Sequence, residues 1–402
     1  MPTPPFLQRV RLRNFKSIRE CDVELGPLTF LVGPNGSGKS NFVDALRFVS
    51  HALQASLETA VSARNGYNEL RRKPGKNVGL HIGLDLHLGG FRPPRLDTWE
   101  LQLRPDARGG FRVARESCRC SLPFVVHDPG TGEKQVVEGP EYHVANGAAK
   151  WNVPFPKPAA SPTGLFLTTC SGLLSFSRVD RALKSMSCHN LNPHRMREPQ
   201  APDPGMTLAP DGYNLAAMVH RLKDGSREAF GQAIDALRTI LPGLSTIERA
   251  TVGPLETLRF TMSGRGGAAT RYYAAQMSDG TLRALGCLVA LYGPGSPRTG
   301  YAVPFVAVEE PETAVHPGAV RVLLDAMREA SLTRQVLVTT HSPDLLDHPD
   351  ISADQIRAVT MVNGETLISQ IDDVAREVLR DRLYTAGELH RLGQLTPAGA
   401  DG

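Results

Sequence analysis

The sequence has little cysteine and no paired-cysteine motif. Its 402 residues include six cysteines, and none of them forms a CxxC pair. Cys118 and Cys120 are the closest two, and no second pair follows at the spacing of a zinc site. A disulfide framework and a structural zinc site are therefore both disfavoured. Reduced thiols in a cytoplasmic protein are the simpler interpretation.

Long apolar runs are also missing. The longest, residues 285–292, is far shorter than the roughly 20 residues that a helix needs to cross a bilayer. Residues 1–15 contain no apolar core of the kind found in signal peptides. We therefore expect a cytoplasmic protein without a membrane partner.

A strong excess of one charge is absent as well. The formal net charge of +4 is compatible with a nucleic-acid partner but does not require one. Aromatic residues make up only 6%, and no platform of interleaved aromatic and basic residues is evident. Arg9, Arg11 and Arg13 share one strand face, and residues 71–73 are basic with Lys76 nearby. Each group would either meet phosphates or face solvent, and both interpretations stay open.

What is present is an α/β pattern that is interrupted in the middle of the chain. Residues 7–15 alternate as in a strand with one buried face, and residues 27–32 form a more apolar strand that runs into a glycine-rich turn and a helix. Neither a heptad run nor an internal repeat is found. In the middle of the chain, short strands are predicted at residues 78–87 and 98–103. A loop rich in Pro and Gly is predicted at residues 190–212, and a helical segment at residues 214–240.

The last third returns to alternating helices and buried strands. The expected helices cover residues 280–291 and 317–330, and the expected strands cover residues 303–308, 335–340 and 356–362. The simplest architecture is one α/β core split by a long insertion. In this division residues 1–60 and 256–402 form the core, and residues 61–255 form a β-rich and helical insertion with a Pro-rich linker.

A phosphate-binding loop is the strongest motif. Residues 33–40 fit G-x-x-x-x-G-K-[ST] and stand between a predicted strand and a predicted helix. Consecutive backbone N–H groups in such a turn form an anion cradle, and the helix directs its positive end at the phosphates. Lys39 would bridge the outer phosphates of ATP, and Ser40 would ligate Mg²⁺. The candidate nucleotide-binding residues here are Asn35, Gly36, Ser37, Gly38, Lys39, Ser40 and Asn41.

Two acidic residues follow the apolar strand at 303–308. A buried strand presents such acids at its carboxyl end, where ligands bind in open α/β sheets. We expect Glu309 to contribute to the Mg²⁺ shell through water, and Glu310 to activate the attacking water as a general base.

Two further motifs gain weight from these. Ser278 and Gly280 precede a helix, which alone would indicate only a good N-cap. His341 ends another apolar strand, where a lone histidine is usually structural. In the company of the other motifs, Ser278 and Gly280 fit a signature motif that meets the γ-phosphate held by a second subunit. His341 fits a switch residue that hydrogen-bonds the γ-phosphate.

These four motifs, in this order, resemble the ABC-type ATPases of the SMC, RecF and OLD group. Residues 14–17 (NFKS), 278–283 (SDGTLR) and 309–312 (EEPE) add to the resemblance, which is closest to the stand-alone bacterial AAA family ATPases. The resemblance implies a P-loop NTPase fold of the ABC type with a mixed sheet and flanking helices. It also implies a homodimer that sandwiches ATP, hydrolyses it, and works in DNA maintenance or in antiviral defence with DNA or an effector protein as partner.

The sequence departs from that group in three places. Glu309 replaces an aspartate that is usual in SMC-like heads, and Asp279 stands where transporters have glycine, so hydrolysis is expected to be slow without a partner. The acidic pair Asp372 and Asp373 does not form the pattern of the metal-binding nuclease domain of OLD proteins, so no nuclease is expected in cis. The glutamine that senses Mg²⁺ in related heads has no anchored candidate.

Two other functions remain as alternatives. A transporter ATPase subunit would need a membrane partner, and the long insertion and the missing glycine pair of the signature argue against it. A P-loop kinase of a small molecule would leave residues 278–283 and His341 without a role.

Overall fold

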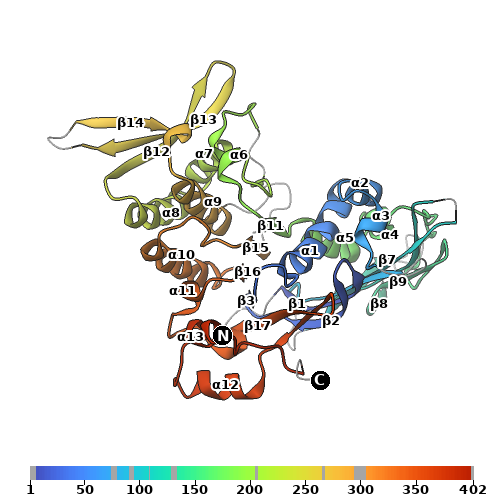
Figure 1. Ribbon diagram of the computed structural model, residues 1–402. Coiled ribbons are helices and arrows are strands. Elements are labelled where there is room, and N and C mark those ends of the chain that lie inside the picture. Colours follow the sequence, from blue (N-terminus) through green and yellow to red (C-terminus); the bar gives the residue numbers. More distant parts are fainter. Residues whose placement is uncertain are drawn as a thin grey trace.

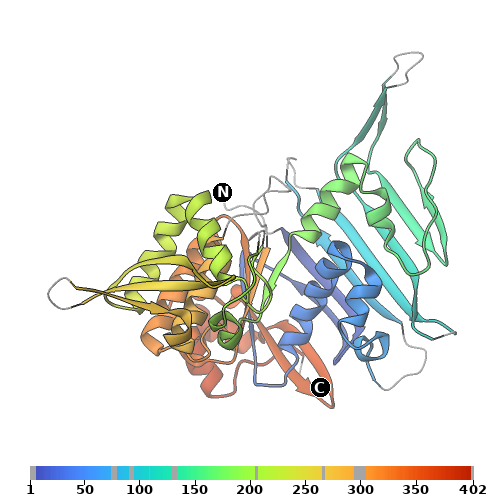
Figure 2. The same ribbon diagram turned by 90° about the horizontal axis from the view of Figure 1, so that it is seen from above.

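The computed structural model describes residues 6–73, 79–89, 95–107, 109–127, 134–203, 207–264, 268–293 and 305–399. Figures 1 and 2 show a central sheet, a larger antiparallel sheet on one side of it, and a helical part that carries a three-stranded sheet on the other side. The long helix that follows the phosphate-binding loop lies between the central and the antiparallel sheets (Figure 1).

The central sheet is mostly parallel, and its strands β3 (Leu28–Val32), β15 (Phe305–Glu309) and β16 (Gln335–Thr340) are buried on both faces, as is usual for such sheets. Leu31, Ala307 and Leu337 belong to the core cluster that includes α1 (Lys39–Gln54), whereas Phe30 and Val308 belong to the cluster of α9 (Asp279–Tyr292) and α10 (Pro317–Ala330). Successive residues of one strand thus serve opposite faces, as the two-residue period requires. The strand order is β11 (Ser187–His189), β15 (Phe305–Glu309), β16 (Gln335–Thr340), β3 (Leu28–Val32), β17 (Ile356–Val362) and β18 (Glu365–Gln370), with only β18 antiparallel to its neighbour.

The antiparallel sheet joins the first two strands of the chain to strands of the expected insertion. Val10 and Leu12 are fully buried on its inner face, whereas Arg9 and Arg13 lie on the outer face, as the alternation predicts. The strand order is β10 (Ala148–Trp151), β9 (Glu141–Ala145), β6 (Phe111–Arg119), β5 (Asp97–Pro105), β4 (Leu80–Leu86), β1 (Leu7–Phe15) and β2 (Ile18–Glu24). β7 (Phe124–His127) and β8 (Lys134–Val137) form a separate hairpin.

Helices cover both sides of the central sheet. α1 and its neighbours fill the space toward the antiparallel sheet, and α7 to α10 cover the other face beside the sheet of β12, β13 and β14 (Figure 2). The helices are α1 (Lys39–Gln54), α2 (Leu57–Ser62), α3 (Tyr67–Leu70), α4 (Phe166–Cys170), α5 (Leu174–Lys184), α6 (Pro193–Arg197), α7 (Leu215–Gly225), α8 (Arg227–Ile240), η2 (Ala274–Gln276), α9 (Asp279–Tyr292), α10 (Pro317–Ala330), α11 (Pro343–Leu346), η3 (Ala353–Gln355), α12 (Asp373–Arg380) and α13 (Ala386–Arg391). The three strands beside them are β12 (Leu244–Val252), β13 (Leu255–Ser263) and β14 (Ala269–Tyr273).

The predicted mixed α/β architecture is confirmed, and strands of the expected insertion pair with strands of the expected core. β4 pairs with β1, β11 pairs with β15, and β13 pairs with β12 across residue 255. Residues 303 and 304 of the expected strand, together with Val78 and Lys76, lie outside the described residues. No helix in the described part of the chain has the length and hydropathy of a membrane span.

Candidate nucleotide-binding site

The phosphate-binding loop connects β3 to α1 at the carboxyl edge of the central sheet. Gly36 and Gly38 have positive φ values of 77° and 102°, which a side chain would disfavour. The Lys39 ammonium donates to the carbonyl oxygens of Gly33 at 2.7 Å and of Pro34 at 2.9 Å, so the lysine closes over its own loop. Burial lowers the pKa of Lys39. The Ser37 hydroxyl is buried and has no hydrogen-bond partner among the described residues.

The loop packs tightly against β17 and β18 of the central sheet. A methyl group on Gly33 would lie 1.9 Å from the carbonyl oxygen of Val359 in β17, and one on Gly38 would lie 2.0 Å from the Thr366 hydroxyl in β18. That hydroxyl donates to the Ser37 carbonyl oxygen at 2.9 Å. Strands from the last part of the chain therefore fix the shape of the loop.

The Asn41 side chain is bonded to the turn between β1 and β2. Its amide donates to the Ser17 hydroxyl at 2.6 Å, and Ser17 lies 2.7 Å from the Thr366 hydroxyl. Ser40 and Asn35 are exposed at the mouth of the loop. Asn41 thus links the NFKS segment to the helix start, whereas Ser40 and Asn35 are accessible to a ligand.

Glu309 ends β15 and forms a buried ion pair with a residue that the sequence analysis did not consider. The Arg47 guanidinium donates to one Glu309 carboxylate oxygen at 2.6 Å, and the Glu309 side chain is only 3% exposed. The other carboxylate oxygen is buried without a hydrogen-bond partner in the described part of the chain. α1 therefore positions the acid that ends β15.

Glu310 and His341 lie together beyond the strand ends. The His341 Nδ1 atom is 3.3 Å from a Glu310 carboxylate oxygen, and both side chains are partly exposed. Glu310 has a positive φ of 44°, and its N–H donates to the Thr339 carbonyl oxygen at 3.0 Å. The turn that carries Glu310 is thereby held to β16, the strand that His341 directly follows.

Glu312 is a third acid at this edge, and it also was not predicted as a site residue. It accepts a hydrogen bond from the Thr340 hydroxyl at 2.6 Å, and one of its oxygens is 3.4 Å from the His341 backbone nitrogen. Burial raises the pKa of Glu312. The signal for it was present, because it belongs to the EEPE segment.

The signature segment begins α9 and contacts the acidic turn of its own chain. Ser278 is the N-cap, and its hydroxyl accepts from the Thr281 N–H at 3.2 Å. A methyl group on Gly280 would lie 2.3 Å from the Ala314 carbonyl oxygen, and Arg283 donates to the Glu310 carbonyl oxygen at 3.4 Å. No hydrogen bond or ion pair joins residues 278–281 to the phosphate-binding loop within the described ranges.

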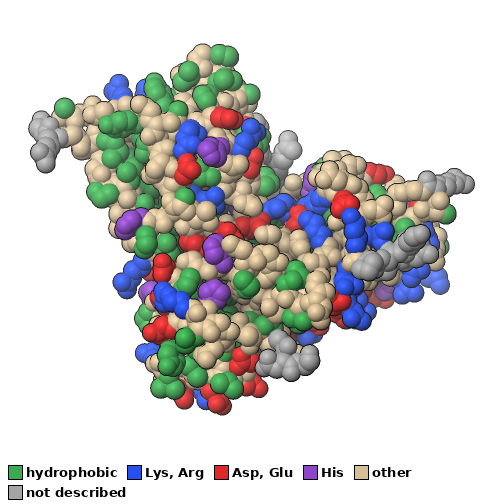
Figure 3. Space-filling view, viewed as in Figure 1, with side chains coloured by type: hydrophobic (Ala, Val, Ile, Leu, Met, Phe, Trp, Pro, Cys, Tyr) green, Lys and Arg blue, Asp and Glu red, His purple; other side chains and the backbone are tan. Residues whose placement is uncertain are grey.

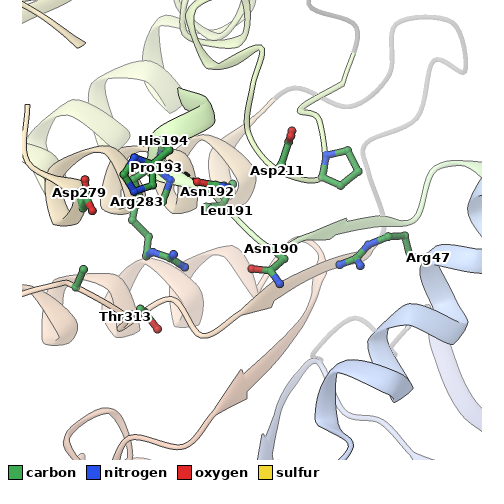
Figure 4. A pocket seen from close by; sticks show the side chains of 12 residues that line it. Arg47, Asn190, Leu191, Asn192, Pro193, His194, Asp211, Asp279, Arg283 and Thr313 are labelled. Carbon is green, nitrogen blue, oxygen red and sulfur yellow. Dashed lines mark hydrogen bonds between the residues drawn. The ribbon is translucent and has the colours of Figure 1, made fainter. Parts of the chain in front are cut away.

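A pocket of about 620 Å³ opens between α1, the first turn of α9 and the segment after β11 (Figure 4). Asn190 follows β11 directly and lies in Figure 4 between Arg47 and Arg283. Because β11 runs parallel to β15, Asn190 reaches the same sheet edge as Glu309. It is a polar residue of the pocket lining that no sequence motif marked.

The residues at this edge suit a nucleotide with Mg²⁺. The unpartnered Ser37 hydroxyl and Glu309 oxygen, and a lysine bonded only to loop carbonyls, are polar groups that a bound phosphate and its ion would satisfy. Mg²⁺ at nucleotides takes one or two protein ligands and completes its shell with phosphates and water. The described residues contain no cluster of three or more His, Cys, Asp or Glu side chains that would form an all-protein metal site.

The basic residues considered for nucleic acid are paired with acids or amides. Arg9 pairs with Asp22, Arg13 with Glu20, Arg72 with Glu365, and Lys73 with Glu69, and Arg11 bonds Asp85 through two nitrogens. Arg71 donates to Asn68. Figure 3 shows Lys and Arg gathered over the antiparallel-sheet side with acidic side chains among them. Of the acidic pair near the end, Asp372 caps α12 through the Ala375 N–H at 2.8 Å.

The fold and the arrangement of the site define the architecture of an ABC-type P-loop ATPase. A family model described as "AAA domain, putative AbiEii toxin, Type IV TA system" matches residues 177–347. Another, "RecF/RecN/SMC N terminal domain", matches residues 6–62. The chain is therefore SMC-, RecF- and OLD-like in sequence, which confirms the predicted resemblance.

Curated relatives match shorter segments. The DNA replication and repair protein RecF of Vibrio vulnificus is 38% identical over 64 residues, which are 16% of this chain and 17% of the relative. The OLD nuclease of Thermus scotoductus is 40% identical over 53 residues, 13% of this chain and 10% of the relative. The chromosome partition protein Smc of Methanocaldococcus jannaschii is 50% identical over 44 residues, which are 11% of this chain and 4% of the relative. The matched segment spans no more than 17% of any of these three relatives.

Two solved structures share the fold over most of the chain. An Smc head bound to the C-winged helix domain of ScpA has a TM-score of 0.51 at 15% identity, covering 90% of this chain and 97% of that chain. The Smc head of Pyrococcus furiosus bound to the C-terminal domain of ScpA also has a TM-score of 0.51, at 13% identity, covering 94% and 100%. At these identities the likeness shows the fold alone.

Proposed function

We propose that this protein binds ATP with Mg²⁺ and hydrolyses it in a head-to-tail homodimer that acts as a conformational switch. The observation that carries the proposal is the convergence, at one edge of the central sheet, of an anion-binding loop, three buried oxygens without a partner in the described residues, and the pair of Glu310 and His341. A P-loop kinase would not need α9 to be tied to the Glu310 turn by Arg283.

The loop residues bind and orient the phosphates. The N–H groups of Asn35, Gly36, Ser37 and Gly38 form the cradle, and Lys39 exchanges its loop carbonyls for phosphate oxygens. Mg²⁺, when bound, neutralises charge on the outer phosphates. Ser40 and Glu309 are the side chains that would hold it, and Asn41 holds the start of α1 against Ser17.

Glu310 and His341 would carry out the hydrolytic step. A carboxylate at the end of a strand accepts a proton from an attacking water, and the His341 Nδ1 atom lies 3.3 Å from this carboxylate. His341 donates to the γ-phosphate when it turns from Glu310. Because the two side chains are so close, a phosphate that binds His341 would change the contacts of both Glu310 and His341.

The place of the signature supports the proposed dimer. Ser278 and Gly280 begin α9, and their helix end is not bonded to the chain's own phosphate-binding loop in the described residues. A second copy turned head to tail would bring them to the γ-phosphate. The relatives' names point to DNA maintenance, and we propose that role, with DNA or an effector protein as partner and antiviral defence as the other setting.

Light scattering with and without ATP and Mg²⁺ tests the proposal. We expect wild type to dimerise transiently with ATP, and Glu310→Gln to form persistent dimers while hydrolysis falls at least about 100-fold. Glu138→Gln, an exposed acid on the antiparallel-sheet side, is the matched control and should behave as wild type. Turnover of ATP by a protein that stays monomeric would contradict the sandwich, and full activity of Glu310→Gln would contradict the assignment of the base.

A further inference from the structure

Helix α13 packs directly on the turn that carries His341. The turn continues into α11, and the two helices approach so closely that a methyl group on Gly387 would lie 2.4 Å from the Pro343 carbonyl oxygen. The same methyl group would lie 2.1 Å from an Asp347 carboxylate oxygen. Leu389 is buried in the core cluster that contains Leu345 of α11. α13 is therefore part of the support of this turn.

Charged and hydroxyl groups fix the same contact. Arg391 pairs with Asp344 at 2.9 Å and with Asp347 at 2.5 Å. The Thr385 hydroxyl, which caps α13, donates to Asp347 at 2.7 Å. Both ends of α13 are thus bonded to the segment that follows His341.

His390 makes the contact that reaches His341 itself. Its Nε2 atom lies 3.1 Å from the His341 carbonyl oxygen, and because a carbonyl only accepts, Nε2 carries the proton. On the other side of the residue, the His341 backbone nitrogen faces Glu312. The two polar groups of the His341 backbone are therefore held from two directions, while its imidazole stays free to face Glu310. Burial lowers the pKa of His390, which favours its neutral form.

We propose that His390 is a positioning residue of the switch: it acts through His341 by fixing the backbone from which the imidazole reaches the γ-phosphate. The inference rests on the proposed ATPase function. His390 would not touch the nucleotide, so its loss should slow hydrolysis while nucleotide binding is preserved.

Two substitutions separate this role from a general effect on folding. His390→Gln keeps an N–H donor near the place of Nε2, whereas His390→Leu removes it at similar volume. His220→Leu, a partly exposed histidine of α7, is the matched control. We expect His390→Leu to lower kcat about tenfold with the Kd for ATP changed less than about twofold, and His390→Gln to stay within about twofold of wild type.

Amide hydrogen exchange of residues 340–347 in the nucleotide-free protein gives a readout that does not depend on turnover. Exchange should be faster in His390→Leu and unchanged in His390→Gln and His220→Leu. The proposal is overturned if Gln is as impaired as Leu, if ATP affinity falls as much as kcat, or if Leu behaves as wild type. If wild type does not hydrolyse ATP, the proposed function fails, and the exchange data alone decide whether His390 holds the turn.

Discussion

At the scale of single residues, the pair of Arg47 and Glu309 has the largest expected effect on stability. Arg47→Ala would leave a carboxylate that is 3% exposed without its cation. Breaking a buried pair costs about 3 kcal/mol, and since Arg47 is itself a quarter exposed we expect about 2 kcal/mol. Chemical denaturation without nucleotide measures the change. Arg9→Ala removes a pair with Asp22 that is roughly half exposed, and should cost less than about 0.5 kcal/mol. Equal losses in the two variants would contradict the prediction.

His189 makes a prediction about pH. It is buried in β11, and burial lowers its pKa from 6.5 to about 4. Between these values the unfolded chain binds a proton that the folded chain does not, so stability is full above pH 6.5 and falls as the pH drops toward 4. The loss is on the order of 3 kcal/mol.

Comparing the pH dependence of unfolding in two variants isolates this effect. His189→Gln should flatten the fall in stability between pH 6.5 and 4, whereas His143→Gln, at an exposed site on β9, should retain it. A fall that is the same in His189→Gln as in wild type would assign it to other groups.

The residues that could be predicted from the sequence are those of local motifs. Lys39, Glu309 and His341 stand in short patterns with the right flanking strands. Arg47 is 262 residues from Glu309, and His390 is 49 residues from His341, so neither contact leaves a local pattern. The contacts of Arg47 and His390 can be recognised only in the folded structure.

At the scale of elements, the contact between the phosphate-binding loop and β17 is a testable joint. Gly33→Ala would place a methyl group 1.9 Å from the Val359 carbonyl oxygen, and this backbone atom could move aside only if β17 shifted. We expect a loss of about 3 kcal/mol, seen as a lower Tm. Gly36→Ala in the same loop has open space and only its positive φ to oppose it, so it should cost about 1 kcal/mol. A similar Tm in both variants would mean that the joint adapts.

Elements with a strong pattern were predicted with their bounds. β1, β16, β17 and α10 have the expected limits. β16 is buried along its whole length, and the buried residues of α10 keep the helical period. The helical segment 214–240 is divided by Ser226, which caps α8. β11 has three residues, too few to show a period, and so its place in the central sheet could not be predicted.

At the scale of the whole molecule, the order of strands was not predictable, because no local pattern pairs β3 with β16 and β17. The pairing brings the first and last thirds of the chain to one site (Figure 1). Within the described residues, no hydrogen bond joins the start of α9 to the phosphate-binding loop of the same chain. In the proposed head-to-tail dimer, each chain contributes its phosphate-binding loop to one site and its signature to the other site.

Mixing two inactive variants tests that arrangement. Lys39→Ala disables the phosphate-binding loop, and Ser278→Arg fills the signature, so each alone should be inactive. In an exchanged equal mixture, half of the dimers are mixed, and each mixed dimer has one site with both intact halves, so activity should recover to roughly a quarter of wild type. Wild type mixed with the double variant should also give roughly a quarter, because its mixed dimers contain no intact site. If both halves of a site came from the same chain, the first mixture would stay inactive and the second would keep about half of the activity.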